Sequence, residues 1–586
     1  MALLPRVDAV CIGVGWTGGI LAAELTKAGM TVVGLERGEG DRGTDDFQHD
    51  HDELRYSVRG HLFQDFAKET VTVRHKPRGR ALPMRRLGSF YPGTGVGGAG
   101  VHWNGQSFRY YPNDFLMRSQ TIERYGRRKI PENMTIEDWG ITYEELEPYY
   151  DRWEYMAGIA GRAGNLRGEI QPGGNPFEGP RSREYPVGPM QESWGGSIFG
   201  SAASGLGLHP YPQPSANLPE AYINPDGQFR DHCLYCGFCE HYGCEVGAKA
   251  DPNVTVIPQA LKTGRFELRT GANVVKIMHD GRQATGVQYV DRSGRLVEQP
   301  ADIVLVTAWV FNNTRLLLLS RMGEPYDPFT QKGVIGRNYA YQVTPPPARA
   351  FFDDKDLHTF MGSGANGVVV DDYNADNFDH SNLGFIGGAA LIGSSRGDRP
   401  IEVVQAPPDV PQWGAEWKRA IRKSFRRQYM VLIQGQSPAY RTNYLDLDPT
   451  YKDALGRPLL RMTFDFHRNE RRMAKYAGDK AAEIVKAMGA HKVAGRGVAG
   501  VLEAHWDTTR YQSTHNTGGV IMGTSPERSA VNTYLQMWDY TNVFVVGASA
   551  FPQNSALNPT GTVAALAYRT AEAIVERYRH QPGPLA

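Results

Sequence analysis

The stretch Val7-Asp8-Ala9-Val10-Cys11-Ile12-Gly13-Val14-Gly15-Trp16-Thr17-Gly18 places a short apolar run directly before a glycine-rich turn. A helical pattern from Gly19 to Ala28 follows, and then a second apolar run from Thr31 to Glu36. A G-x-G-x-x-G motif binds a dinucleotide when it lies between a strand and a helix and a second strand ends in an acid. The sequence therefore predicts a dinucleotide-binding α/β unit at the N-terminus.

Each residue of this motif has a physical task. Gly13 allows the tight turn, Gly15 lets a pyrophosphate approach the backbone, and Gly18 lets the helix pack on the strand. Glu36 follows Gly18 by eighteen residues and is placed to accept hydrogen bonds from a ribose. The alternative is an ordinary glycine-rich turn between a strand and a helix. Cys11 lies within the first strand, and we interpret it as a small buried hydrophobe.

Composition and charge exclude some classes of protein. The chain has 586 residues, 41% of them hydrophobic, and a formal net charge of +1. This length allows more than one domain, and the balanced charge gives no support to a nucleic-acid partner. No run of eighteen apolar residues predicts a membrane span. The first eight residues lack the features of a signal peptide, so we expect the chain to carry no export signal of its own.

A second glycine-rich stretch runs from Gly93 to Gly105 and contains six glycines in thirteen residues. Such a stretch suits a loop that lies flat against a bulky planar or anionic ligand. A flavin needs contacts to both its pyrophosphate and its ring system, and two glycine loops fit that need. His102 lies within this loop.

Two motifs close the chain. The first is Thr514 to Thr524, which contains His515, and the second begins with the strand Val543 to Val546 and leads into a final helix from Pro559. The N-terminus of that helix can direct backbone N–H groups at an electron-rich ring. His515 and Asn558 are 43 residues apart (558 − 515) and each belongs to one motif.

The fingerprint, the loop around His102 and both C-terminal motifs resemble the glucose–methanol–choline (GMC) flavoprotein oxidoreductases. Over nearly the full length the chain is similar to the large catalytic subunits of bacterial membrane-bound sugar and sugar-acid dehydrogenases. The resemblance implies an α/β fold, α+β overall, with a Rossmann-like FAD-binding domain and a substrate domain on a mostly antiparallel sheet. It places the FAD-binding domain at residues 1–340 and 501–586 and the substrate-binding domain at 341–500. Residues 161–232, rich in Gly and Pro, are interpreted as a segment that wraps the surface.

The resemblance also implies the site residues. It assigns cofactor contacts to Gly13, Gly15, Gly18, Glu36, Gly97, Gly98, Gly100, His102, Asn104, Val274, Gly547, Ala548, Asn558 and Thr560. FAD is either joined covalently to His102 or held there without a bond. His515 is expected to act as the base that removes a hydroxyl proton, while Asn558 holds the hydroxyl in position. The family's usual small-residue signature is altered at Trp309 to Asn313, so no flavin contact is assigned there.

Four of the five cysteines lie within twelve residues, as Cys233, Cys236, Cys239 and Cys244 in a C-x2-C-x2-C-x4-C pattern. Thiolates grouped this tightly can hold one soft metal centre. The pattern favours an iron–sulfur cluster, because tetrathiolate zinc sites usually take two well-separated C-x2-C pairs. The resemblance implies [3Fe–4S], which leaves one cysteine spare, whereas [4Fe–4S] would use all four.

Together these features predict an FAD-dependent dehydrogenase that oxidises a hydroxyl of a sugar, polyol or gluconate-like sugar acid. Electrons would leave through the cluster to a cytochrome c or quinone acceptor. The resemblance implies a small partner subunit with a twin-arginine export signal and a multihaem cytochrome c subunit. It places the enzyme on the periplasmic face of the bacterial inner membrane, or in the cytoplasm without partners. The alternatives are a soluble oxidase that uses O2 and a non-catalytic electron-transfer subunit with a structural zinc site.

Overall fold

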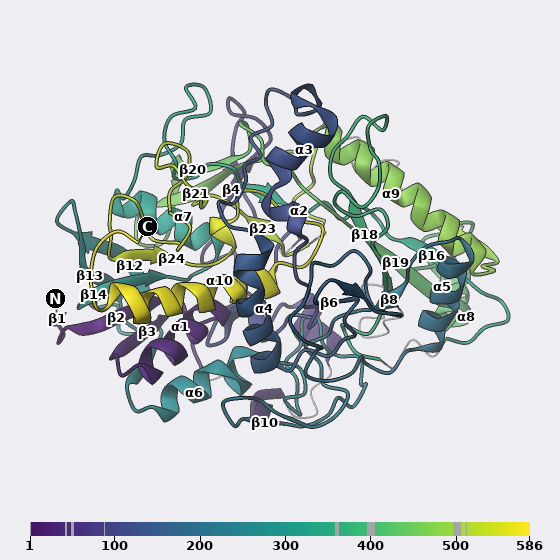
Figure 1. The fold of residues 1–586 in the computed structure, drawn as a ribbon, viewed down its shortest axis with the longest axis horizontal. Helices are drawn as coiled ribbons and strands as arrows, with labels where there is room; N and C mark the ends of the chain where they lie inside the picture. Colours follow the sequence, from purple (N-terminus) through teal and green to yellow (C-terminus); the bar gives the residue numbers. More distant parts are fainter. Residues whose placement is uncertain are drawn as a thin grey trace.

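The fold is known from a computed structural model. It describes residues 2–40, 44–47, 52–86, 88–357, 362–394, 405–495, 505–510 and 513–585. Two large sheets lie at opposite ends of the longest dimension of the molecule (Figure 1). The predicted start of the second FAD-binding segment, at residue 501, lies outside the described residues. The proposed domain boundaries therefore stay predictions.

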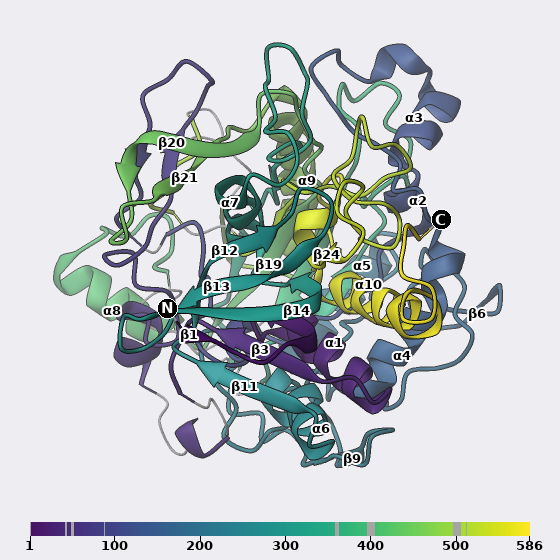
Figure 2. The ribbon, with the colours of Figure 1, turned by 90° about the vertical axis from the view of Figure 1, so that its left-hand side faces the viewer.

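The first sheet has eight strands and contains the N-terminal fingerprint. Its main order is β11-β3-β2-β14-β13-β12, and β1 and β24 also pair with β14. The strands are β1 (Ala2–Leu3), β2 (Val7–Ile12), β3 (Val32–Glu36), β11 (Phe266–Thr270), β12 (Asn273–His279), β13 (Ala284–Val290), β14 (Leu296–Val306) and β24 (Val543–Val545). Strands β11, β3, β2, β14 and β24 pair in parallel, while β12 and β13 form an antiparallel hairpin (Figure 2).

Helices cover this sheet because its central strands are apolar on both faces. Helix α1 (Trp16–Lys27) packs against α6 (Val256–Lys262) and α10 (Thr560–Ala573). A Cβ added at Gly19 would lie 2.7 Å from a methyl carbon of Val256, so glycine lets α1 and α6 approach closely. The chain's first and last helices thus lie together on the nucleotide-binding sheet.

The second sheet has six strands in the order β22-β16-β19-β18-β17-β8, and all its pairs are antiparallel. The strands are β8 (Tyr211–Pro212), β16 (Ala348–Phe351), β17 (Val368–Val370), β18 (Ala389–Ser394), β19 (Gln428–Gly435) and β22 (Lys492–Ala494). Helices α5 (Trp194–Gly205) and α9 (Arg468–Ala487) pack against it. The predicted antiparallel sheet is confirmed. The interpretation of residues 161–232 as a surface wrap is wrong in part, because this segment supplies α5 and the edge strand β8.

Helix α4 (Tyr143–Ala157) shows how local sequence fixes an element. The backbone N–H of Glu145 donates to Thr142 Oγ1 at 3.3 Å, and the Thr142 N–H donates to Glu145 Oε2 at 2.7 Å. This reciprocal capping box satisfies two N–H groups at the helix start. The helix ends at Gly158, whose left-handed φ of 59° costs glycine little.

A buried ion network ties α4 to the rest of the molecule. Arg109 Nη2 lies 2.7 Å from Glu154 Oε2, and Arg181 also binds the Glu154 carboxylate. Burial raises the pKa of Glu154, but the two guanidinium groups oppose this and hold it below its ordinary value. The carboxylate is therefore retained in its charged form inside the protein.

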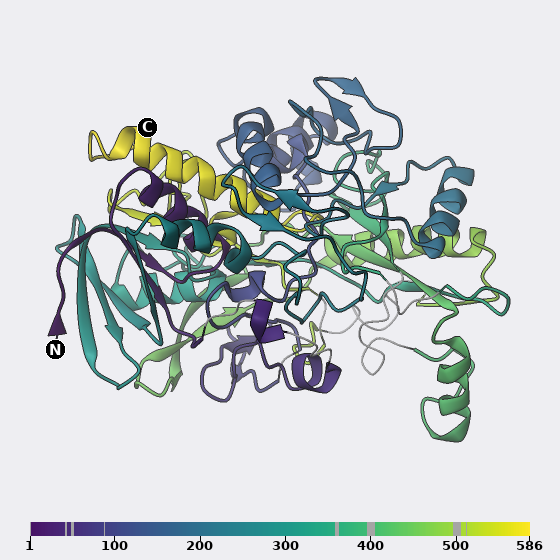
Figure 3. The same ribbon diagram turned by 90° about the horizontal axis from the view of Figure 1, so that it is seen from below.

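The remaining elements connect and flank the two sheets. A four-stranded sheet of order β20-β21-β4-β5 joins residues 72–83 to residues 444–463. Its strands are β4 (Thr72–Arg74), β5 (Leu82–Pro83), β20 (Tyr444–Lys452) and β21 (Pro458–Thr463). The other α-helices are α2 (Pro112–Phe115), α3 (Met117–Tyr125), α7 (Val310–Ser320) and α8 (Gly414–Ser424). The short strands outside the large sheets are β6 (Asn165–Leu166), β7 (Glu169–Ile170), β9 (Tyr222–Ile223), β10 (Phe229–Arg230), β15 (Ala340–Tyr341) and β23 (Asn516–Thr517). Helix α8 extends away from the body (Figure 3). Within the described residues, no helix combines the length and the apolar character needed to cross a bilayer.

Candidate active site

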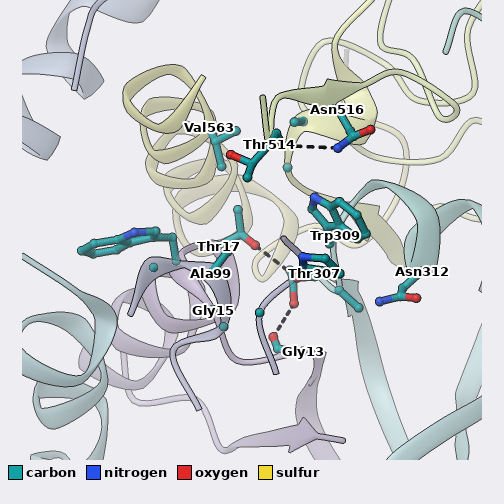
Figure 4. Close-up of a pocket in the computed structure, with 18 of the residues that line it drawn as sticks. Gly13, Gly15, Thr17, Ala99, Thr307, Trp309, Asn312, Thr514, Asn516 and Val563 are labelled. Carbon is teal, nitrogen blue, oxygen red and sulfur yellow. Dashed lines mark hydrogen bonds between the residues drawn. The ribbon is translucent and has the colours of Figure 1, made fainter. Parts of the chain in front are cut away.

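One cavity collects the residues that the sequence predicts for the cofactor. It lies where the fingerprint turn, the second glycine loop and the C-terminal motifs meet (Figure 4). Its lining includes Gly13, Gly15, Glu36, Gly97, Gly98, Gly100, His102, Asn104, Val274, His515, Gly547, Ala548, Asn558 and Thr560. Gly18 is absent from that lining and lies behind the turn instead. Segments more than 500 residues apart in the chain therefore form one site.

The fingerprint turn depends on close backbone approach. Gly13 has a φ of 93°, and a Cβ added there would lie 2.9 Å from Ala308 Cα. A Cβ at Gly18 would lie 2.1 Å from the carbonyl oxygen of Gly13. Thr307 Oγ1 donates to that same carbonyl at 2.8 Å and fixes the turn against β14 (Figure 4). Only glycine permits this packing at both positions.

The two glycine loops lie against each other and leave space for an anion to approach the backbone. Gly97 N–H donates to the Val14 carbonyl at 2.8 Å. A Cβ at Gly15 would have no neighbour nearer than Gly97 O at 3.7 Å, and one at Gly98 none nearer than Gly15 Cα at 3.7 Å. Helix α1 begins there without a side-chain cap. Its N-terminal N–H groups therefore remain available to a phosphate.

Glu36 lies at the end of β3 and is buried. One carboxylate oxygen accepts from Val14 N–H at 3.2 Å and the other from Gly38 N–H at 2.8 Å. The side chain thus closes the turn while it lines the cavity. Each carboxylate oxygen can accept a further hydrogen bond, so this structural role leaves the predicted ribose contact open to test.

His102 is buried in the loop that carries it, and its Nε2 atom has no hydrogen-bond partner within the described residues. Its ring packs edge-on against Phe63 with centroids 4.5 Å apart. Burial, helped by the nearby ammonium of Lys249, lowers the pKa of His102 to about 3. The imidazole is consequently neutral near pH 7 and presents a ring nitrogen to the flavin end of the cavity.

His515 and Asn558 face each other, as predicted. Asn558 Nδ2 lies 3.1 Å from His515 Nε2. On the opposite side of the ring, His515 Nδ1 lies 2.7 Å from Gln342 Oε1. Burial lowers the pKa of His515 to about 4, and Glu240 opposes this only in part. The imidazole is therefore neutral above that pH.

Gln342 determines which nitrogen of His515 carries the proton. The Gln342 amide nitrogen donates to the carbonyls of Ser555 at 3.2 Å and Ala556 at 2.9 Å. Because those two acceptors fix the amide, its oxygen is the atom that meets Nδ1. Nδ1 must then carry the hydrogen, and Nε2 presents a lone pair. The tautomer and the orientation of the His515 ring are thus set by three chain segments.

The cysteine loop, residues 233–244, packs directly against the glycine-rich loop of His102, residues 93–105. His241 N–H donates to the His102 carbonyl at 2.8 Å. The ammonium of Lys249 is fully buried and donates to the carbonyls of Trp103, Cys239 and Tyr242, each at 2.7 Å. The cavity is also lined by Glu240 and His241, which lie between the third and fourth cysteines. The loop therefore belongs to the wall of the cavity.

The four clustered cysteines are free thiols. Cys233 and Cys239 are buried, and Cys236 and Cys244 are half-buried. Burial, with smaller contributions from Cys244 and Cys236, raises the pKa of the Cys233 thiol to about 12. The Tyr235 N–H donates to Cys233 Sγ at 3.3 Å. If these thiols were ionised, the thiolates would repel one another, so their ionisation would need a compensating cation.

The sulfur atoms of the four clustered cysteines are not tightly grouped. Among the residues that the structure describes, no three of the cysteine sulfurs lie within 4.8 Å of one another. Tetrahedral zinc at about 2.3 Å from each sulfur would place the sulfurs about 3.8 Å apart. In a cluster each thiolate binds a different iron, so its sulfurs need not approach so closely. The positions of these thiols therefore do not distinguish zinc from an iron–sulfur cluster.

Several lining residues carried no recognised sequence signal. Trp309 lines the cavity although no contact is assigned to it from the sequence, and its φ of 74° is rare outside glycine. Such strain recurs at functional sites and could have marked this position only once backbone angles were known. Thr344 and Gln434 also line the cavity. Their positions follow from strand pairing, which no local pattern records.

Comparisons with known proteins agree with this geometry. Models of the GMC oxidoreductase family match residues 220–344 and 439–567. The chain is 45% identical to a gluconate 2-dehydrogenase flavoprotein of Pantoea cypripedii over 99% of this chain and 95% of that protein. It is 30% identical to a 2-methyl-1,2-propanediol dehydrogenase of Mycolicibacterium austroafricanum, covering 98% and 96%, and 26% identical to the fructose dehydrogenase large subunit of Gluconobacter japonicus, covering 97% of each.

A solved structure shares the fold. Pyridoxine 4-oxidase from Mesorbium loti superposes with a TM-score of 0.60 and 17% identity, covering 99% of this chain and 100% of the other. The low identity limits that comparison to the fold, whereas the full-length sequence relatives show the family. The chain therefore belongs to the GMC oxidoreductase family and is an FAD-dependent oxidoreductase that acts on CH–OH groups.

Proposed function

We propose that the chain is the flavoprotein subunit of a dehydrogenase that oxidises a hydroxyl of a gluconate-like sugar acid, a sugar or a polyol. The observation that carries this proposal is the 3.1 Å approach of Asn558 Nδ2 to His515 Nε2 in the cavity. The similarity to a gluconate 2-dehydrogenase flavoprotein supports the substrate class. FAD, when bound, supplies the hydride acceptor.

The protein's part in the reaction is proton removal and positioning. His515 Nε2 takes the hydroxyl proton, since Nδ1 is already protonated against Gln342. Asn558 Nδ2, which donates to Nε2, can donate to the hydroxyl oxygen once a substrate lies between the two side chains. The pKa of about 4 keeps His515 neutral at physiological pH. Because His515 takes the proton as the hydride leaves, the substrate does not pass through a free alkoxide.

The cradle fits FAD. Gly15 and Gly98 leave room for the pyrophosphate, and the uncapped start of α1 offers N–H groups to it. The start of α10 brings Thr560 and Val563 to the cavity. His102 Nε2 is a neutral, unpartnered nitrogen, as a covalent bond to the flavin would need. We assign that bond to His102.

The cysteine loop fits an iron–sulfur cluster as the exit for electrons. Cys233, Cys236, Cys239 and Cys244 would hold it, as [3Fe–4S] or [4Fe–4S]. Support comes from the C-x2-C-x2-C-x4-C pattern, from the N–H bond to Cys233 Sγ, and from direct hydrogen bonds to the loop of His102. Hydrogen bonds to cluster sulfurs tune such centres. The acceptor would then be a protein partner.

That acceptor would be a multihaem cytochrome c subunit or a quinone, with a small subunit that carries a twin-arginine signal. We place the assembly on the periplasmic face of the bacterial inner membrane. One relative is described as a large subunit, which is consistent with partners. The second candidate is an oxidase that uses O2, favoured by a 25% identical relative, paromamine 6'-oxidase of Streptomyces fradiae.

One purified preparation tests these proposals. Iron, sulfide and zinc are measured first, and anaerobic flavin bleaching is then followed with gluconate, sorbitol, fructose and glucose. The proposal expects iron with sulfide, bleaching by at least one of these compounds, and turnover with a dye but little with O2. Zinc without iron would exclude an iron–sulfur cluster as the route by which electrons leave, and rapid peroxide formation would favour the oxidase. Acid precipitation tests His102: flavin colour that leaves with the supernatant excludes a covalent bond.

A further inference from the structure

A polar wall from the second sheet faces the catalytic pair. Strand β19 contributes Leu432 and Gln434 to the cavity lining, two residues apart and therefore on one face. Val343 and Gly435 form an antiparallel bridge, with Gly435 N–H donating to the Val343 carbonyl at 2.8 Å. In that pairing Thr344 lies directly opposite Gln434. Thr344 also lines the cavity.

This wall adjoins the base. Gln342, which binds His515 Nδ1, lies two residues before Thr344, so extended backbone turns both side chains to the same face. On the other side, Gln434 Nε2 meets Gln106 Oε1 at 3.5 Å, a long contact. Gln106 follows Asn104 in the flavin loop, and its N–H donates to Asn104 Oδ1 at 3.1 Å. The wall thus spans from the base to the flavin loop.

Hydrogen-bonding groups on this wall are unused. Gln434 is 8% exposed, and its Oε1 atom has no partner within the described residues. The same holds for Thr344 Oγ1 and, on the catalytic side of the cavity, for Asn558 Oδ1. Buried polar atoms are normally paired. The three residues that carry these atoms line one cavity, which indicates that a ligand there supplies the missing partners.

The chemistry of the wall selects the ligand. An amide and a hydroxyl each donate and accept, as each hydroxyl of a carbohydrate chain does. Leu432 adds an apolar surface suited to the C–H groups between hydroxyls. The three arginines of the described lining, Arg37, Arg315 and Arg457, are each paired to Glu69 or Asp453. The wall therefore suits an uncharged, polyhydroxylated segment.

We propose that Gln434 and Thr344, supported by Gln106, bind hydroxyls of the substrate chain beyond the carbon that is oxidised, and so determine specificity for polyhydroxylated substrates. The inference rests on the proposed function and deepens it. Gln434 is the central member, because it can reach both the substrate and Gln106. An analogue that lacks the bound hydroxyl would leave the buried amide unpaired, which is how such sites discriminate.

The test uses the purified flavin-loaded enzyme and compares wild type with Gln434→Leu, Thr344→Val and the exposed control Gln412→Leu. Anaerobic flavin reduction is measured with gluconate and with its 3-, 4-, 5- and 6-deoxy analogues. For Gln434→Leu we expect the half-saturating gluconate concentration to rise roughly 10- to 100-fold, with a smaller change in the limiting rate. Gln412→Leu should equal wild type.

The analogues give the decisive readout. One deoxy analogue should lose the same factor in wild type that Gln434→Leu loses with gluconate, and combining the two changes should add little. The proposal would be overturned if, for every analogue, the loss from the missing hydroxyl multiplied with the loss from Gln434→Leu. It would also be overturned if Gln434→Leu reduced the limiting rate equally for all substrates. If Gln434→Leu fails to hold flavin, the near-isosteric Thr344→Val gives the same cycle. A wild type that no sugar, polyol or sugar acid reduces refutes the proposed function itself.

Discussion

Replacing Asn558 by aspartate should convert the neutral base into a protonated one. The change is isosteric and places a carboxylate oxygen where Nδ2 now lies, 3.1 Å from His515 Nε2. With charge centres about 4 Å apart and an effective dielectric constant of about 20, the attraction is about 4 kcal/mol. That corresponds to an upward shift of about 3 units in the pKa of His515.

The wild-type pKa of about 4 would thus move toward about 7 in Asn558→Asp. A base works only when unprotonated, so its activity is present above its pKa and falls about tenfold per unit below it. Flavin reduction at saturating substrate should therefore stay flat from pH 5 to 8 in wild type. In Asn558→Asp it should fall about 50-fold between pH 7 and pH 5, because half of the base is already protonated at pH 7.

Stopped-flow flavin reduction across this pH range is the assay, with Asn558→Ser as the neutral control. The control removes the amide without adding a charge, so its rate should fall while the pH profile stays flat. A flat profile in Asn558→Asp, with flavin content and thermal midpoint unchanged, would refute His515 as the base. An equal fall at low pH in both variants would show that loss of the amide, and not the added charge, causes the pH dependence.

Three further changes test other parts of the molecule. Cys236→Ser should lose iron and dye or cytochrome reduction but keep flavin reduction by substrate. The control Cys11→Ala should retain all three. Loss of flavin reduction in Cys236→Ser would contradict separate roles for the flavin and the cysteine loop. Arg181→Met breaks the buried network and should cost about 3–5 kcal/mol, while the half-exposed Arg183→Met should cost at most about 1 kcal/mol; similar thermal midpoints would argue against the network. Thr142→Ala removes the capping oxygen and should cost about 0.5–2 kcal/mol of stability by denaturant titration, with unchanged activity.

Local patterns predicted the parts of the fold that local chemistry determines. The strand before Gly13 and the helix after the turn appear as expected, because turns depend on neighbouring residues. The facing of His515 and Asn558 was predicted from a family resemblance and agrees with the 3.1 Å approach. Glycine positions were predictable because steric demand leaves no alternative residue.

Other features escaped prediction because they arise from long-range pairing. Gln434 and Thr344 come to one cavity with the bridge between Val343 and Gly435, 92 residues apart (435 − 343). Gln342 meets His515 Nδ1 although the two residues are 173 apart in the chain. Helix α5 was not predicted in its glycine-rich stretch, because six of its twelve residues are Gly or Ala and give no clear amphipathic pattern. Tertiary contacts override local signals in these cases.

The buried Lys249 has a consequence for how the protein matures. Its ammonium joins the carbonyls of Trp103 and Cys239, so the cysteine loop and the flavin loop share one internal anchor. A metal centre that orders the cysteine loop would therefore also order Glu240 and His241 in the flavin cavity. By thermodynamic linkage, each cofactor would tighten the hold on the other by the same factor. Insertion of the two cofactors would then be cooperative, and half-loaded chains would be scarce beside empty and fully loaded ones.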